Sequence, residues 1–139
     1  MYISKHFCIE ELVSKEMFDN VHEDVLWRMF TPGILKTLDA IKDAFPKGSM
    51  SVNSWKWGGD RNWSGLRTRD SKWYSEGSRH SCGDAFDCVF SEYTAEEARS
   101  YILSHQGEFP DLTRVEGKVS WLHADCKPTG LDKIYVFNV

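Results

Sequence analysis

The chain has 139 residues, a formal net charge of −4 and a hydrophobic content of 41%. This length suits one domain with a packed core, and the acidic balance argues against a protein built mainly to bind nucleic acid, which should be basic. No run of about 18 apolar residues occurs, so we expect no membrane span. The sequence therefore predicts a single monomeric domain over residues 1–139.

Residues 1–46 show the periodicity of helices. Apolar side chains recur at helical spacing over residues 9–17, and a second helix is expected over residues 23–30. Thr31 followed by Pro32 is typical of an N-cap and a first helical position, so a third helix should begin there and end near residue 46. The apolar stripe of this third helix consists of Ile34, Leu35, Leu38, Ile41 and Phe45.

Residues 49–139 show mainly the patterns of strands. Thr94 and Glu97 form a capping box, which predicts one further helix over residues 95–105. Residues 56–79 form a long stretch of weak periodicity, which is typical of a functional loop. Because helices come first and strands follow, we expect an α+β fold with the N-terminal helices packed on a small antiparallel β-sheet. The predicted strands cover residues 50–55, 85–90, 113–116, 120–126 and 134–139.

Two short segments, residues 78–87 and residues 121–125, contain residue types that commonly bind metal ions in proteins. His80, Asp87 and His123 are the ligand types that suit Zn²⁺, and three protein ligands leave a fourth position for water. Successive residues of a strand point to opposite faces, so Ala85 shares a face with Asp87, and Asp125 shares a face with His123. A metal ion between the two strands can then be reached by all three ligands.

A hydrolase built on such a metal ion also needs a base that takes a proton from the attacking water. Glu116 is our candidate, because a hairpin loop of two or four residues would place it on the same face as His123. A three-residue loop would place it on the wrong face. Asp125 has three alternative roles: a hydrogen-bond partner that orients a ligand histidine, a replacement base, or a surface acid.

One of these segments matches a known motif at five fixed positions. The motif Ser-x-His-x-x-Gly-x-Ala-x-Asp is filled by Ser78, His80, Gly83, Ala85 and Asp87. It resembles the signature of the zinc D-alanyl-D-alanine carboxypeptidase family, which includes the L-alanyl-D-glutamate peptidase endolysins of bacteriophages and shares its zinc site with the hedgehog signalling domain. The later pair Trp121 and His123 is similar to the closing motif of that family.

The resemblance implies a zinc metallopeptidase that hydrolyses an amide bond in the stem peptides of peptidoglycan. It implies Zn²⁺ as the cofactor and His80, Asp87 and His123 as its ligands. The bond would be either D-Ala-D-Ala or an endopeptidase target such as L-Ala-D-Glu. Many members of the family carry an acid three positions before the last histidine, where this chain has Ser120, so the base falls to Glu116, seven positions before His123.

The resemblance also implies a cationic side chain that polarises the substrate carbonyl. Arg67 is our first choice, with Lys56 and Arg69 as alternatives. We expect Lys56, together with Ser78 and Trp121, to contact the substrate. Four further tryptophans either line a substrate groove or pack within the domain: Trp55, Trp57, Trp63 and Trp73.

The N-terminus lacks the basic-then-apolar pattern of a secretory signal, so we expect synthesis in a host cytoplasm. An endolysin-like enzyme would then reach the cell wall after release through a separate membrane pore, or as part of a virion. The alternative is a catalytically inactive zinc-binding module that binds cell-wall peptide or a protein partner, as hedgehog-like domains illustrate.

Overall fold

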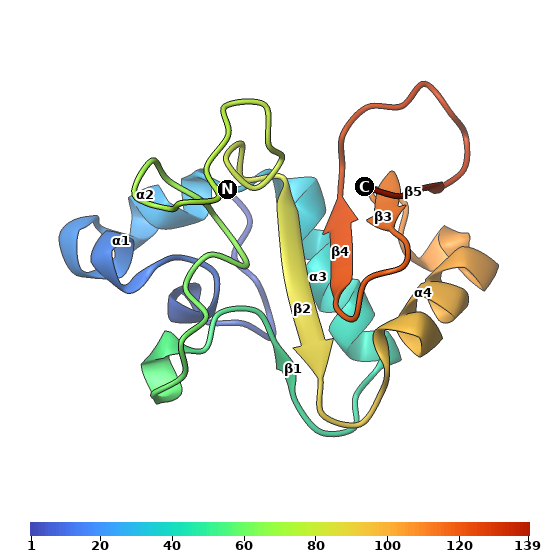
Figure 1. The fold of residues 1–139 in the computed structure, drawn as a ribbon, viewed down its shortest axis with the longest axis horizontal. Coiled ribbons are helices and arrows are strands. Elements are labelled where there is room, and N and C mark those ends of the chain that lie inside the picture. The colour runs from blue at the N-terminus through green and yellow to red at the C-terminus, as the bar shows by residue number, and fades with distance from the viewer.

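Helices occupy the first third of the chain and strands much of the remainder in the computed structural model, which describes residues 1–139 (Figure 1). This confirms the predicted α+β class. The helices are α1 (Lys15–Asn20), α2 (Glu23–Arg28), α3 (Pro32–Ala44) and α4 (Ala95–Ser104). The strands are β1 (Met50–Ser51), β2 (Ala85–Phe90), β3 (Arg114–Glu116), β4 (Leu122–Asp125) and β5 (Tyr135–Phe137).

The five strands form one sheet in the order β1-β2-β4-β3-β5. The pairs β1–β2, β2–β4 and β4–β3 are antiparallel, as expected, whereas β5 runs parallel to β3. The sheet thereby places β2 and β4, which carry the two predicted metal-binding segments, directly side by side (Figure 1). None of the helices is both long and apolar enough to cross a membrane.

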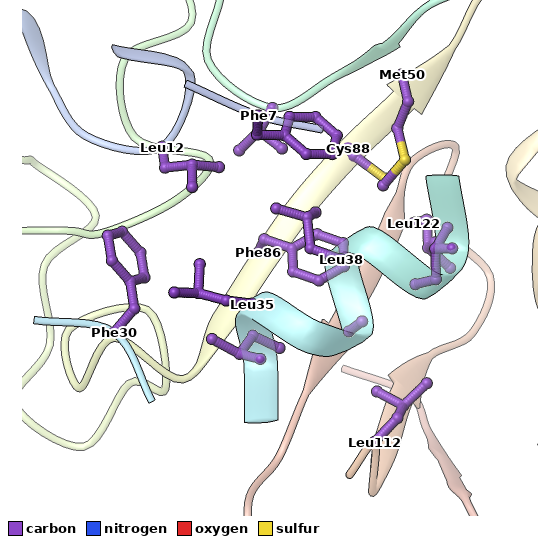
Figure 2. Packing of buried hydrophobic residues seen from close by; sticks show 14 of the residues in the cluster. Phe7, Leu12, Phe30, Leu35, Leu38, Met50, Phe86, Cys88, Leu112 and Leu122 are labelled. Atoms are coloured by element: carbon purple, nitrogen blue, oxygen red, sulfur yellow. The ribbon is translucent and has the colours of Figure 1, made fainter. Parts of the chain in front are cut away.

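Helix α3 covers one face of this sheet. Thr31 caps it by accepting a hydrogen bond from the backbone N–H of Ile34, and Pro32 occupies its first turn, both as predicted. Figure 2 shows Leu35 and Leu38 of α3 beside Phe86 of β2. The strand residues buried on this face include Phe86, Cys88, Val115, Leu122 and Ala124. Because side chains alternate along a strand, the residues between them point to the opposite face.

The helix expected over residues 9–17 is interrupted, which corrects the sequence prediction. A 3₁₀ turn covers Ile9–Glu11, and α1 begins only after Ser14, whose hydroxyl accepts a hydrogen bond from the N–H of Met17. The backbone carbonyls between them are taken by distant groups: that of Leu12 accepts from the N–H of Leu66 at 2.9 Å. Tertiary hydrogen bonds therefore replace the helical ones, although Ile9, Leu12 and Val13 are buried and Met17 is partly buried, as their spacing indicated.

The long segment between β1 and β2 is irregular but anchored. The backbone N–H of Asp87 donates to the carbonyl of Ser64 at 2.7 Å, and Leu66 is held by Leu12. Gly65 lies between these two anchors, where a Cβ atom would sit 2.1 Å from the Leu12 carbonyl oxygen. Only glycine allows this close approach. The expected strand over residues 50–55 is shortened to β1, because the chain turns at Asn53 to join this anchor.

Candidate metal centre

Two of the three predicted ligands face each other across the centre of the sheet. Asp87 of β2 and His123 of β4 are direct partners in the antiparallel register. Their side chains lie on the face opposite α3, and His123 Nδ1 is 2.8 Å from Asp87 Oδ1. The next pair on the same face is Ala85 and Asp125, so the small Ala85 leaves room beside the acid.

The third ligand, His80, comes from the turn that precedes β2. Its Nδ1 lies 2.9 Å from the carbonyl oxygen of Gly65. A carbonyl oxygen can only accept, so Nδ1 donates to it, and Nε2 is the ring nitrogen that faces the site. Nε2 is 3.4 Å from Asp87 Oδ1. The anchored segment before β2 thus fixes both the orientation and the tautomer of this imidazole.

The turn that carries His80 depends on its glycine and on a buried acid. Gly83 has a φ of +67°, and a Cβ there would lie 1.7 Å from the carbonyl oxygen of Met29. Asp84 is almost fully buried and accepts hydrogen bonds from the hydroxyl of Thr31 at 2.7 Å and from the guanidinium of Arg79. The sequence analysis did not single out Asp84, because only the folded chain shows that α3 and the turn share this carboxylate.

The three side chains form a group that could hold a metal ion. One ligand atom from each of His80, Asp87 and His123 lies within 4.8 Å of the others. In a tetrahedral zinc site with ligand bonds of about 2.0–2.1 Å, neighbouring ligand atoms are about 3.4 Å apart. The separation between His80 and Asp87 already has this value, whereas the shorter contact between His123 and Asp87 is that of a hydrogen bond. The residues therefore fit a metal ion once the proton between His123 and Asp87 has left.

Hydrogen bonds to two carboxylates set the protonation of His123. Burial lowers its pKa, but its ring contacts Asp125 through Nε2 and Asp87 through Nδ1, each at 2.8 Å, and together these raise the pKa to about 9. Burial raises the pKa of Asp87, but the hydrogen bonds to His123 and His80 outweigh it and leave that pKa well below its usual range. Without a metal ion, His123 is thus an imidazolium at neutral pH.

Asp125 occupies the position of an orienting partner for His123. It is completely buried, and burial raises its pKa, but hydrogen bonds from His123 and Arg114 lower it to about 2. Arg114 donates to both carboxylate oxygens, at 2.8 and 2.7 Å, and its guanidinium lies 4.1 Å from the centre of the Phe137 ring. With both oxygens engaged, Asp125 is poorly placed to take a proton from water, which disfavours it as the base.

Glu116 lies on the ligand face of the sheet. The register pairs Arg114 with Asp125 and Val115 with Ala124, and its continuation by one residue places Glu116 opposite His123. Six residues, 117–122, lie between Glu116 and His123, and this is the even number that the placement requires. The carboxylate of Glu116 makes no hydrogen bond or ion pair, so it is free to act on a bound molecule.

A pocket of about 470 Å³ opens onto the three ligands. Arg67 reaches its edge, with one guanidinium nitrogen 3.3 Å from Asp87 Oδ2. Lys56 does not line this pocket: its ammonium pairs with Glu10 at 2.8 Å. Arg69 also lies outside it, paired with Glu76 at the surface. The predicted site residues that the structure does bring together here are Arg67, Ser78, His80, Asp87, Glu116, Trp121, His123 and Asp125.

Arg114 also lines this pocket, and the sequence analysis missed it. Strand parity was a usable signal, since a residue two positions before Glu116 points to the same face. Together, the fold and the three ligands define an α+β domain with a candidate metal centre in an open pocket. No protein-family model matches the chain, and comparisons with curated proteins and with solved structures find no match. The chemistry of this chain is therefore inferred from its own residues.

Proposed function

We propose that the chain is a zinc-dependent peptidase that hydrolyses an amide bond in the stem peptides of peptidoglycan. The observation that carries the proposal is the convergence of His80, Asp87 and His123 in an open pocket, with the unpaired carboxylate of Glu116 on the same face. A structural zinc site is usually closed by four protein ligands, whereas three ligands beside a pocket are typical of a catalytic site.

The donor set favours zinc over other biological cations. Two imidazoles and one carboxylate match the ligand sets of known zinc hydrolases, whereas Mg²⁺ and Ca²⁺ prefer oxygen ligands alone. The hydrogen bond that His123 Nε2 donates to Asp125 is of the kind that orients histidine ligands of zinc. When bound, Zn²⁺ lowers the pKa of a coordinated water to about 7 and polarises a carbonyl group.

The side chains around the ligands supply the remaining functions of a hydrolase. Glu116 takes a proton from the attacking water and delivers it to the leaving amine. Arg67, held in place by Asp87 and by the carbonyl of Trp63, donates hydrogen bonds to the developing oxyanion. Trp121 and Ser78 form walls that contact the peptide.

The substrate class rests on the motif. The residues from Ser78 to Asp87 resemble the carboxypeptidase and phage endolysin signature, and this supports a cell-wall peptide as substrate. The proposed place of action is accordingly the bacterial cell wall, reached after release from a host cell or on a virion. One observation favours an inactive zinc-binding module as a second candidate: Ser120 stands where many members of the family carry their base.

A digest of purified peptidoglycan tests the proposal. The protein loaded with Zn²⁺ should release peptide fragments, and a chelator should stop the release; mass spectrometry of the fragments would identify the bond. An inactive module would bind the cell wall and release nothing. Release of the same fragments by fully metal-free protein would contradict the proposal.

A further inference from the structure

A second hollow adjoins the metal pocket and shares three of its walls. It has a volume of about 430 Å³, within the range of ligand sites in proteins, and shares Arg67, Trp73 and Trp121 with the metal pocket. The remaining walls are Asp60, Arg61, Asn62, Trp63 and Ser64. We call this hollow the tryptophan groove.

Two of the three indoles of the groove are exposed, and the third, Trp63, is half-buried. Trp73 is 59% exposed and Trp121 is 39% exposed. By contrast Trp55, which lies outside the groove, packs against Phe18 and donates its indole N–H to the carbonyl of Val13. Large apolar side chains that gather at one exposed hollow mark an interaction site. The Lys72 ammonium lies over the Trp73 ring at 4.4 Å from its centre, but this indole stays largely exposed, so the groove offers accessible apolar surface at Trp73 and Trp121.

The polar walls of the groove select against two classes of occupant. The groove carries no excess of positive charge, because Arg67 is paired with Asp87 and the carboxylate of Asp60 offsets Arg61, so it is poorly suited to a phosphate chain. A wholly apolar peptide is disfavoured because every wall other than the three indoles is polar.

The free polar groups suit hydroxyl and amide groups. The carboxylate of Asp60 makes no hydrogen bond or ion pair within the chain. The side chain of Asn62 uses its oxygen to accept from the backbone N–H of Lys15, which leaves its NH₂ group as a free donor. An occupant should therefore combine a flat apolar face with neutral hydrogen-bonding groups, and a pyranose ring has this combination.

We propose that the tryptophan groove binds a neutral saccharide, namely the N-acetylated glycan chain to which stem peptides are attached. The identity of the saccharide rests on the proposed peptidase function, because the groove continues directly from the metal pocket through Arg67, Trp73 and Trp121. Saccharide binding itself requires no metal ion, since none of the three ligands lines the groove.

Titration of metal-free protein with a tetramer of β-1,4-linked N-acetylglucosamine tests this inference. The tetramer has no peptide bond to hydrolyse, and a chelator keeps the metal centre out of the measurement. Calorimetry and tryptophan fluorescence should both report binding. Trp63→Ala should weaken the affinity about tenfold, because one stacking face is lost, whereas Trp63→Phe should retain most of it. Trp57→Ala is the matched control, since this indole is 62% exposed but lies outside the groove, and it should bind as wild type.

The outcomes separate this inference from the proposed function. If the protein binds the tetramer but fails to cleave peptidoglycan, saccharide binding in the groove is supported and the proposed peptidase function is overturned. Three results would overturn the saccharide proposal. They are no binding of the tetramer, equal affinity of folded Trp63→Ala and wild type, and tighter binding of a single-stranded oligonucleotide. Thermal unfolding of each variant shows that a loss of binding is not a loss of fold.

Discussion

The two faces of the sheet are specified by different physical rules. The face toward α3 consists of apolar side chains, Phe86, Leu122 and Ala124 among them, and burial alone accounts for it. The opposite face buries Asp125 and His123, which are stable there only because each has a charged partner. A change on the first face leaves a cavity, whereas a change on the second leaves a charge without its partner.

The largest effect should follow the loss of a ligand on the polar face. His123→Ala removes one of the three proposed metal ligands and leaves Asp87 and Asp125 without their shared partner. We expect loss of zinc at micromolar metal concentrations and loss of peptidase activity. His105→Ala, at an exposed histidine remote from the site, should bind zinc as wild type. Normal zinc content in the His123 variant, measured by metal analysis after dialysis, would remove this residue from the centre.

Glu116→Gln should separate catalysis from metal binding. The substitution keeps the shape of the side chain but removes the base, so the turnover number should fall by about 10²–10⁴-fold while zinc content stays unchanged. Glu92→Gln, at an exposed acid outside the pocket, is the control. Equal turnover by the Glu116 variant and wild type would show that another group takes the proton.

On the apolar face, Leu38→Ala should act on stability alone. Leu38 of α3 is buried against the sheet, and its truncation should lower the free energy of unfolding by about 2–5 kcal/mol. The fraction that remains folded should bind zinc as wild type, because no ligand moves. Denaturant unfolding measures the first quantity and titration with zinc the second; Leu131→Ala, at an exposed leucine, controls for the substitution itself. A large loss of zinc affinity would show that the two faces are coupled.

A smaller effect on zinc affinity should follow the loss of Arg114, which supports His123 indirectly through Asp125. Arg114→Ala frees Asp125 from its bidentate partner, and loss of such a supporting contact should weaken zinc affinity by about 10–100-fold. Arg114→Lys should recover part of the affinity, because the positive charge remains while the paired geometry is lost. Unchanged affinity in both folded variants would mean that Arg114 merely fills space beside Phe137.

The smallest effect is a dependence of stability on pH in metal-free protein. The pKa of His123 is raised from 6.5 to about 9 in the folded state, so its stabilisation is complete below pH 6.5 and disappears as the pH rises through 9. The pKa of Asp125 is lowered from 3.8 to about 2, so its contribution is complete above pH 3.8 and disappears as the pH falls through 2. Thermal unfolding with a chelator should show the first loss, and His123→Asn should lack it.

Zinc should remove this pH dependence and release a proton. A metal ion binds the neutral imidazole, so loading at pH 7 should release about one proton from His123. Calorimetry in buffers of different ionisation enthalpy counts this proton. No proton release would indicate that His123 is neutral in the metal-free protein.

Local patterns were enough to predict the α+β class and the three side chains, His80, Asp87 and His123, that the structure brings together. β2 begins and ends at the expected residues, and the alternation of Phe86 and Asp87 between core and site follows from strand geometry alone. The capping box of α4 and the proline at the start of α3 also predicted the first residue of each helix correctly. These features depend on neighbours in sequence, which is why they could be read without a structure.

The errors fall where the partner of a residue is distant in sequence. The helix over residues 9–17 failed because Leu12 gives its carbonyl to Leu66, and no local pattern reveals that exchange. Lys56 was assigned to the substrate, yet it pairs with Glu10. The role of Arg114 became visible only when β3 and β4 were placed in register.

The segment around Gly65 makes the beginning of the chain part of the metal centre. Leu12 holds Leu66, Gly65 holds the imidazole of His80, and Ser64 holds the backbone of Asp87, all within three consecutive residues of the segment. A fragment that started at residue 49 would retain every ligand but lose the hold of Leu12 on that segment. The helical part and the sheet part should therefore not function separately. Zinc affinity should fall when the N-terminal residues no longer pack against the segment before β2.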